Sequence, residues 1–63
     1  MKHTLRQQLE NLLERLLERK NGLKKNILEY SGFGDFVNAG INQIKLNQIE
    51  IVVEEIEEML KQN

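Results

Sequence analysis

Cysteine and tryptophan are absent from this sequence, and histidine and serine occur once each, as His3 and Ser31. Without cysteine the fold has no disulfide bond, and a metal ion finds no thiolate ligand. Ser31 lacks a histidine near it in the sequence that would activate it as a nucleophile. Glutamate pairs such as Glu50 and Glu54 offer carboxylates to a divalent ion, but without the histidine partners of di-iron bundles. We therefore expect a non-enzymatic protein with no cofactor and no metal site.

Long apolar runs are absent as well. No segment of about 20 apolar residues, the length that spans a bilayer, occurs in the chain. The N-terminus lacks the apolar segment of a signal peptide. We therefore expect a soluble, cytoplasmic protein with no membrane partner.

The chain is also short. Its 63 residues are expected to form one domain, residues 1–63, near the lower limit at which a chain buries enough surface to fold alone. Ordering each residue costs about 1.5 kcal/mol, and burial in chains of this size scarcely exceeds that cost. We therefore expect a homo-oligomer.

Charge is distributed unequally along the chain, although the net charge is only −1. Residues 1–32 carry seven Lys and Arg against four Glu, which gives +3, whereas residues 33–63 carry two Lys against six Asp and Glu, which gives −4. The low net charge argues against a general nucleic-acid or membrane binder. The asymmetry calls for complementary charge, either within an oligomer or on a separate partner.

Helix-compatible sequence is interrupted at only one place, the stretch Ser31-Gly32-Phe33-Gly34-Asp35. Gly32 and Gly34 carry no Cβ, so the backbone can adopt a left-handed conformation and reverse. Asp35 offers a carboxylate as the N-cap of a following helix. The stretch predicts a turn over residues 31–35 between two helices. The aromatic residues gather around it: Tyr30, Phe33 and Phe36.

The first helix is expected over residues 4–31. Thr4 and Gln7 have the spacing of a capping box. Apolar residues then recur at alternating spacings of four and three, which is typical of a seam between two helices. The seam keeps its face across Asn21-Gly22, so we favour a continuous helix over a break at this dipeptide. The seam of the first helix consists of Leu9, Leu13, Leu16, Lys20, Leu23, Ile27 and Tyr30.

The second helix is expected over residues 35–62. β-Branched residues over 49–53 are also compatible with a strand, but the sustained heptad spacing favours a helix. This helix is apolar beyond the face that one neighbour can cover, which implies a second partner. Its seam is Ala39, Asn42, Leu46, Ile49, Val53, Ile56 and Leu60, and the apolar residues outside the seam are Val37, Ile41, Ile44, Ile51, Val52 and Met59.

The two seams have matching registers. In an antiparallel hairpin, facing positions have numbers with a constant sum, and the seam pairs, from Tyr30 with Phe36 to Leu9 with Ile56, add up to 65 or 66. The sequence therefore predicts an all-α antiparallel helical hairpin. Because the second helix needs another partner, we expect a homodimeric four-helix bundle.

Two polar residues, Lys20 and Asn42, interrupt the seams. A polar residue at such a position often fixes register or oligomeric state, and a lysine can extend its ammonium group past the apolar edge to solvent. An extended Lys20 side chain has the length to reach Glu50 on the facing helix. A buried cation poised for catalysis is the weaker interpretation, because no neighbouring acid, base or cleft is identified.

These features favour a small regulatory or adaptor protein that binds another protein through the surface of a helical bundle. The alternative is an RNA- or DNA-binding regulator that uses a basic face of the first helix, although no aromatic residues are interleaved there for base stacking. Antiparallel pairing of two hairpins also accounts for the charge asymmetry without nucleic acid. The candidate interface residues are Leu16, Leu23, Ile41, Ile44, Ile49, Val52, Ile56 and Met59, and the candidate nucleic-acid face is Arg15, Arg19, Lys24 and Lys25.

Overall fold

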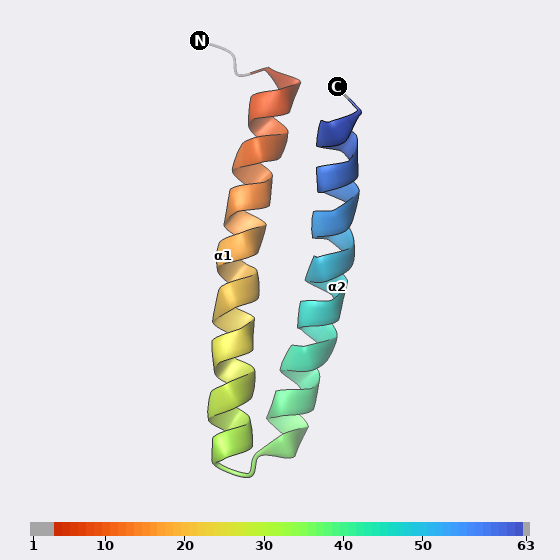
Figure 1. Cartoon of the computed structure of the whole chain (residues 1–63). Helices are drawn as coiled ribbons and strands as arrows, with labels where there is room; N and C mark the ends of the chain where they lie inside the picture. The colour runs from red at the N-terminus through yellow and green to blue at the C-terminus, as the bar shows by residue number, and fades with distance from the viewer. Residues whose placement is uncertain (1–3, 63) are drawn as a thin grey trace.

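The computed structural model describes residues 4–62 and contains two helices, α1 (Leu5–Gly32) and α2 (Phe36–Lys61). The helices lie side by side and antiparallel, with a short turn at one end (Figure 1). The molecule measures 47 × 22 × 12 Å, so it is a single layer about one helix diameter thick. The predicted all-α hairpin is confirmed.

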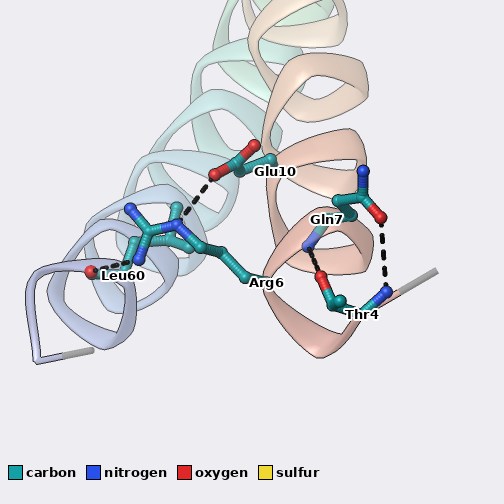
Figure 2. A network of polar contacts seen from close by, with 5 residues as sticks. All are labelled: Thr4, Arg6, Gln7, Glu10 and Leu60. Atoms are coloured by element: carbon teal, nitrogen blue, oxygen red, sulfur yellow. Dashed lines mark hydrogen bonds and ion pairs between the residues drawn. The ribbon is translucent and has the colours of Figure 1, made fainter.

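The N-terminus of α1 carries the predicted capping box (Figure 2). The Gln7 main-chain N–H donates to Thr4 Oγ1 at 3.1 Å, and the Thr4 N–H donates to Gln7 Oε1 at 3.3 Å. Two main-chain N–H groups near the start of the helix thus find acceptors that the helix itself does not supply. The helix therefore begins at Leu5, directly after its cap.

Helix α1 runs without a break through Gly22. Gly22 is exposed, and a Cβ at this position would meet no atom within 4 Å. The residue lies on the side of α1 away from α2, where a glycine weakens a helix by about 1 kcal/mol relative to alanine without ending it. The prediction of a continuous helix is confirmed.

The turn between the helices is a Schellman motif. The Asp35 N–H donates to the Tyr30 carbonyl at 2.8 Å, and the Gly34 N–H donates to the Ser31 carbonyl at 3.1 Å, which is the bonding pattern that closes many helix C-termini. Gly34 has φ +76°, so this glycine supplies the left-handed residue. Gly32, in contrast, is the last residue of α1, so only one of the two glycines reverses the chain.

Asp35 starts α2 with its side chain. Its Oδ1 accepts a hydrogen bond from the Asn38 N–H at 3.2 Å, and its Oδ2 accepts one from Asn38 Nδ2 at 2.6 Å. A carboxylate at this position satisfies a free N–H group and complements the positive end of the helix dipole. One short segment therefore ends α1, reverses the chain and caps α2.

The core of the hairpin is the predicted seam. All fourteen seam positions are buried or half-buried, and outside the seams only Asp35 and Glu50 among residues 4–62 are not exposed. The periodicity of the sequence therefore identified fourteen of the sixteen positions in this range that are not exposed. Phe36, which the register pairs with Tyr30, is instead 72% exposed. The most buried side chains, 3% to 8% exposed, are Leu23, Ala39, Leu46, Val53 and Ile56.

A contact at the open end agrees with the predicted register. Arg6 Nη1 donates to the main-chain oxygen of Leu60 at 3.3 Å (Figure 2). The two residue numbers add up to 66, within the range expected for facing positions. The helices are therefore in register from the turn to the end of the hairpin.

Candidate interaction surface

Helix α2 carries a second apolar face in addition to the seam. An α-helix turns by about 100° per residue, and on that basis six apolar residues of α2 fall within an arc of about 100°, centred about 140° from the seam. Their side chains are 41% to 75% exposed. We call this set the α2 stripe: Val37, Ile41, Ile44, Ile51, Val52 and Met59.

The hairpin exposes more surface than a compact monomer of its mass. Its accessible area is 5134 Å², and compact monomeric proteins of 7.4 kDa expose about 4,200 Å². The excess of roughly 900 Å² is close to the area of about 800 Å² that each partner buries in a standard protein interface. The excess reflects the elongated, single-layer shape of the hairpin.

The predicted interface residues divide into two groups. Ile41, Ile44, Val52 and Met59 lie on the exposed α2 stripe. Leu16, Leu23, Ile49 and Ile56 lie in the seam between α1 and α2, where Leu23 is 8% and Ile56 3% exposed. Val37 and Ile51 are not among the predicted interface residues, although their spacing from Ile44 places them on the same face.

The four basic residues of the candidate nucleic-acid face do not share one side of α1. Arg15 and Arg19 lie about 40° apart around the helix, whereas Lys24 lies about 140° and Lys25 about 120° from Arg19. All four side chains are exposed. Of these four residues, only Arg15 and Arg19 therefore lie on one side of α1 and one turn apart.

An open groove of about 280 Å³ lies between α1 and α2. Its volume is close to the lower end of the range of about 300–1,000 Å³ that is typical of ligand pockets. Gln43 lies on the side of α2 away from the α2 stripe, so the groove and the stripe occupy different faces. The groove is lined by Lys24, Ile27, Leu28, Gln43 and Leu46.

The polar seam residues form no reactive cluster. Lys20 and Glu50 are both half-buried, but no ion pair joins them in the structure. Asn42 Nδ2 donates to the Asn38 carbonyl of its own helix at 2.8 Å. Within residues 4–62, no buried side-chain nitrogen or oxygen lacks a hydrogen-bond partner. The hairpin therefore contains no strained or orphaned polar group in this region.

Residues 4–62 contain no group of metal ligands and no helix that could span a membrane. No three His, Asp or Glu side chains within residues 4–62 lie close enough together to hold a metal ion. In the same range, neither helix has the length and apolar character needed to cross a bilayer. His3 lies outside the described residues. The remaining features of the surface of residues 4–62 are its shape, its charge and its exposed apolar side chains.

Comparisons of this chain with models of protein families, with curated proteins and with solved structures find no match.

Proposed function

We propose that this hairpin is a non-enzymatic interaction module that pairs with a second copy through the α2 stripe, and that the resulting four-helix bundle acts as a small regulatory or adaptor protein. The observation that carries the proposal is the α2 stripe itself. Its residues follow helical spacing, and a face with this spacing packs best against another helix. The hairpin alone has no second layer to cover it.

The thickness of the hairpin supports the same proposal. At 12 Å it is one helix thick, and no side chain among residues 4–62 is less than 2% exposed. Chains of this size usually need oligomerisation, disulfides or a metal to stabilise them, and this chain has no cysteine. A second layer of helices would complete the core.

Once the α2 stripe is covered, the groove side remains for another protein. Leu28 is 74% exposed at the rim of the groove, beside Lys24. Leu17, also exposed, lies on the same side of α1. Apolar side chains beside a single cation suit an amphipathic helix that carries an acidic residue. This is the surface through which we propose that the dimer acts as an adaptor.

The dimer is tested by light scattering after size exclusion. We expect twice the mass of the chain, both at low and at high salt. Ile44→Glu together with Ile51→Glu places carboxylates on the α2 stripe and is expected to raise the dissociation constant by about 100-fold or more. Asn47→Glu adds a carboxylate to an exposed position of α2 outside the stripe and serves as the control. A wild-type chain that is monomeric at every concentration contradicts the proposal.

The adaptor surface is tested separately with Leu28→Glu. This variant is expected to remain dimeric and to lose a protein that the wild type retains. If the Ile44→Glu, Ile51→Glu variant loses this protein and the Leu28→Glu variant retains it, the protein binds to the α2 stripe instead. The hairpin would then be one half of a hetero-complex.

The nucleic-acid alternative has support only from Arg15 and Arg19. Two adjacent arginines per copy can contact phosphates, and binding of this kind weakens steeply as salt rises. It requires that duplex DNA or RNA be retained at low salt and released by Arg15→Glu with Arg19→Glu. We expect no retention at about 0.15 M salt, where so few phosphate contacts are largely screened.

A further inference from the structure

We propose that α2 of one copy packs against α2 of the other in the opposite direction, about a two-fold axis that passes beside Gln48; this arrangement rests on the proposed dimer. In such a pair, residues at equal distances from the axis face each other. Val37 and Met59 lie eleven residues on either side of Gln48, and Ile44 and Val52 lie four residues on either side. The arrangement therefore brings apolar side chains of the two copies together.

Gln48 is suited to a position at a two-fold axis. It lies near the middle of the arc that the α2 stripe occupies. Its side chain is exposed, and its side-chain amide makes no hydrogen bond within residues 4–62. A glutamine amide is both a donor and an acceptor, so two copies of it can pair with each other. A single polar residue in an apolar interface also fixes register.

Two further pairs place long polar side chains beside apolar ones. Ile41 faces Glu55, and Ile51 faces Lys45. Lys45 lies at the edge of the α2 stripe, so its methylene stem can cover Ile51 while its ammonium group stays in water. Glu55 lies near the middle of the same arc, so its carboxylate needs a cation of the other copy beside it. Lys45 of one copy and Glu55 of the other then lie about one helical turn apart, near enough for attraction.

Charge determines the direction of the pairing. Residues 36–48 of α2 contain Lys45 and no acidic residue, whereas residues 49–61 contain five glutamates and Lys61. Parallel pairing would place the two acidic segments side by side, and like charges at this density repel. Antiparallel pairing places each acidic segment beside the segment that contains Lys45. The charge pattern therefore favours the antiparallel arrangement.

The same register places basic residues of α1 at the level of the acidic segment of the other copy. Residues of α2 that are symmetric about Gln48 are at the same level, and residues of α1 and α2 whose numbers add up to about 66 are at the same level. Residues 50–58 of one copy are therefore level with residues 20–28 of the other, which include Lys20, Lys24 and Lys25. The opposite charges of the two halves of the chain are thus at the same level along the dimer, with α2 between its own α1 and the other copy.

Helix α1 is a poorer partner for the α2 stripe. Its exposed leucines away from the ends are Leu12, Leu17 and Leu28, and Leu12 lies about 140° around the helix from Leu17. They do not form a stripe of matching length. A second α2 is therefore the occupant that fits in length, apolar character and charge.

Single-cysteine variants of the full chain test this arrangement without background, because the chain contains no cysteine. Gln48→Cys is expected to form a disulfide-linked dimer under mild oxidation, since the axis brings the two copies of this position together. Ile44→Cys and Val52→Cys are each expected to remain unlinked alone and to link to each other when mixed. Asn47→Cys, on α2 but outside the stripe, is the control and is expected to remain unlinked.

The outcomes separate this inference from the proposed function. If Ile44→Cys links efficiently to itself, the helices pair in parallel and the inference is wrong, although the dimer stands. If the wild type is a dimer but Gln48→Cys does not link, the stripe packs in another register or against α1, and the inference is again wrong. If the wild type is a monomer, the proposed function itself fails. Circular dichroism of each variant confirms that it is helical before linking is compared.

Discussion

The guanidinium group of Arg6 donates a hydrogen bond to the main-chain oxygen of Leu60, 54 positions away, at 3.3 Å. Leu60 belongs to the last turn of α2, whose carbonyl groups have no partner within the helix and carry partial negative charge. In the first turn of α1 the same cation would be unfavourable, but Glu10 lies 3.1 Å from Arg6 Nε and offsets it. The position of Arg6 is therefore explained by the hairpin and not by α1 alone.

Replacing Arg6 tests this relationship. Arg6→Ala is expected to lower the free energy of unfolding by about 0.5–1 kcal/mol, because an exposed charge-assisted contact and its effect on the α2 dipole are lost. Urea denaturation at a fixed protein concentration measures the change. Arg15→Ala, another exposed arginine of α1, is the control. Equal losses in the two variants would mean that the contact with Leu60 contributes nothing.

Substitution of two glycines by alanine is expected to have opposite effects. Gly34→Ala places a Cβ at φ +76° and is expected to cost about 1–2 kcal/mol. Gly22→Ala lies within α1, where a Cβ meets no atom within 4 Å, and is expected to gain about 0.5–1 kcal/mol. Thermal unfolding of both variants at one concentration provides the comparison. Stabilisation by Gly34→Ala would exclude the left-handed turn described above.

Leu46 is 5% exposed in the centre of the seam. Leu46→Ala is expected to lower the free energy of unfolding by about 2–3 kcal/mol, toward the lower end of the usual range, because a single-layer hairpin can relax around the lost volume. Asn47→Ala, at the adjacent exposed position, is expected to change it by less than about 0.5 kcal/mol. Denaturant titration distinguishes the two. A small effect of Leu46→Ala would mean that the two helices do not pack through this seam.

Salt is expected to weaken the proposed dimer slightly. Opposite charges attract across an antiparallel interface, and raising the ionic strength from about 0.05 to 0.5 M shortens the screening length several-fold. The dissociation constant, measured by sedimentation equilibrium, is expected to rise a few-fold over this range. A parallel dimer would respond in the opposite sense, because its acidic segments repel at low salt. Complete dissociation in salt would show that charge, and not the α2 stripe, holds the copies together.

The seam was predictable from the sequence because its cause is local. Apolar residues at spacings of three and four can lie on one face only in a helix, so the spacing predicts Leu23, Leu46 and Val53 in the hairpin interior. The capping box at Thr4 was predictable for the same reason, since it depends on residues within one turn.

Other features depend on where helices end and how they are rotated. Gly32 and Gly34 can both adopt a positive φ. Which of them does so depends on where α1 ends, and because α1 ends at Gly32, Gly34 takes the positive φ. The contact with Glu50 that Lys20 has the length to make does not form, because facing levels do not fix where two long side chains point. The contact of Arg6 with Leu60 requires both the register and a free carbonyl, and neither can be read from the residues around Arg6.

The basic residues illustrate a limit of reading a helix by spacing alone. Arg15, Arg19, Lys24 and Lys25 are close in sequence, but placing them around a continuous helix separates the lysines from the arginines. The proposed function has no such local signal, because binding by a bundle surface requires only shape, charge and exposed apolar side chains. The partner of an interaction module is therefore harder to predict from sequence than the reaction of an enzyme.

The matched registers of α1 and α2 also constrain how a chain of this kind changes length during evolution. Inserting or deleting one residue rotates the rest of a helix by about 100° and moves its seam out of contact. Seven added residues restore the face, but seven in one helix alone leave two turns without a neighbour. Paired changes of one heptad in each helix preserve every contact and lengthen the rod by about 10 Å. Related hairpins are therefore expected to differ in length by fourteen residues, divided equally on the two sides of the turn.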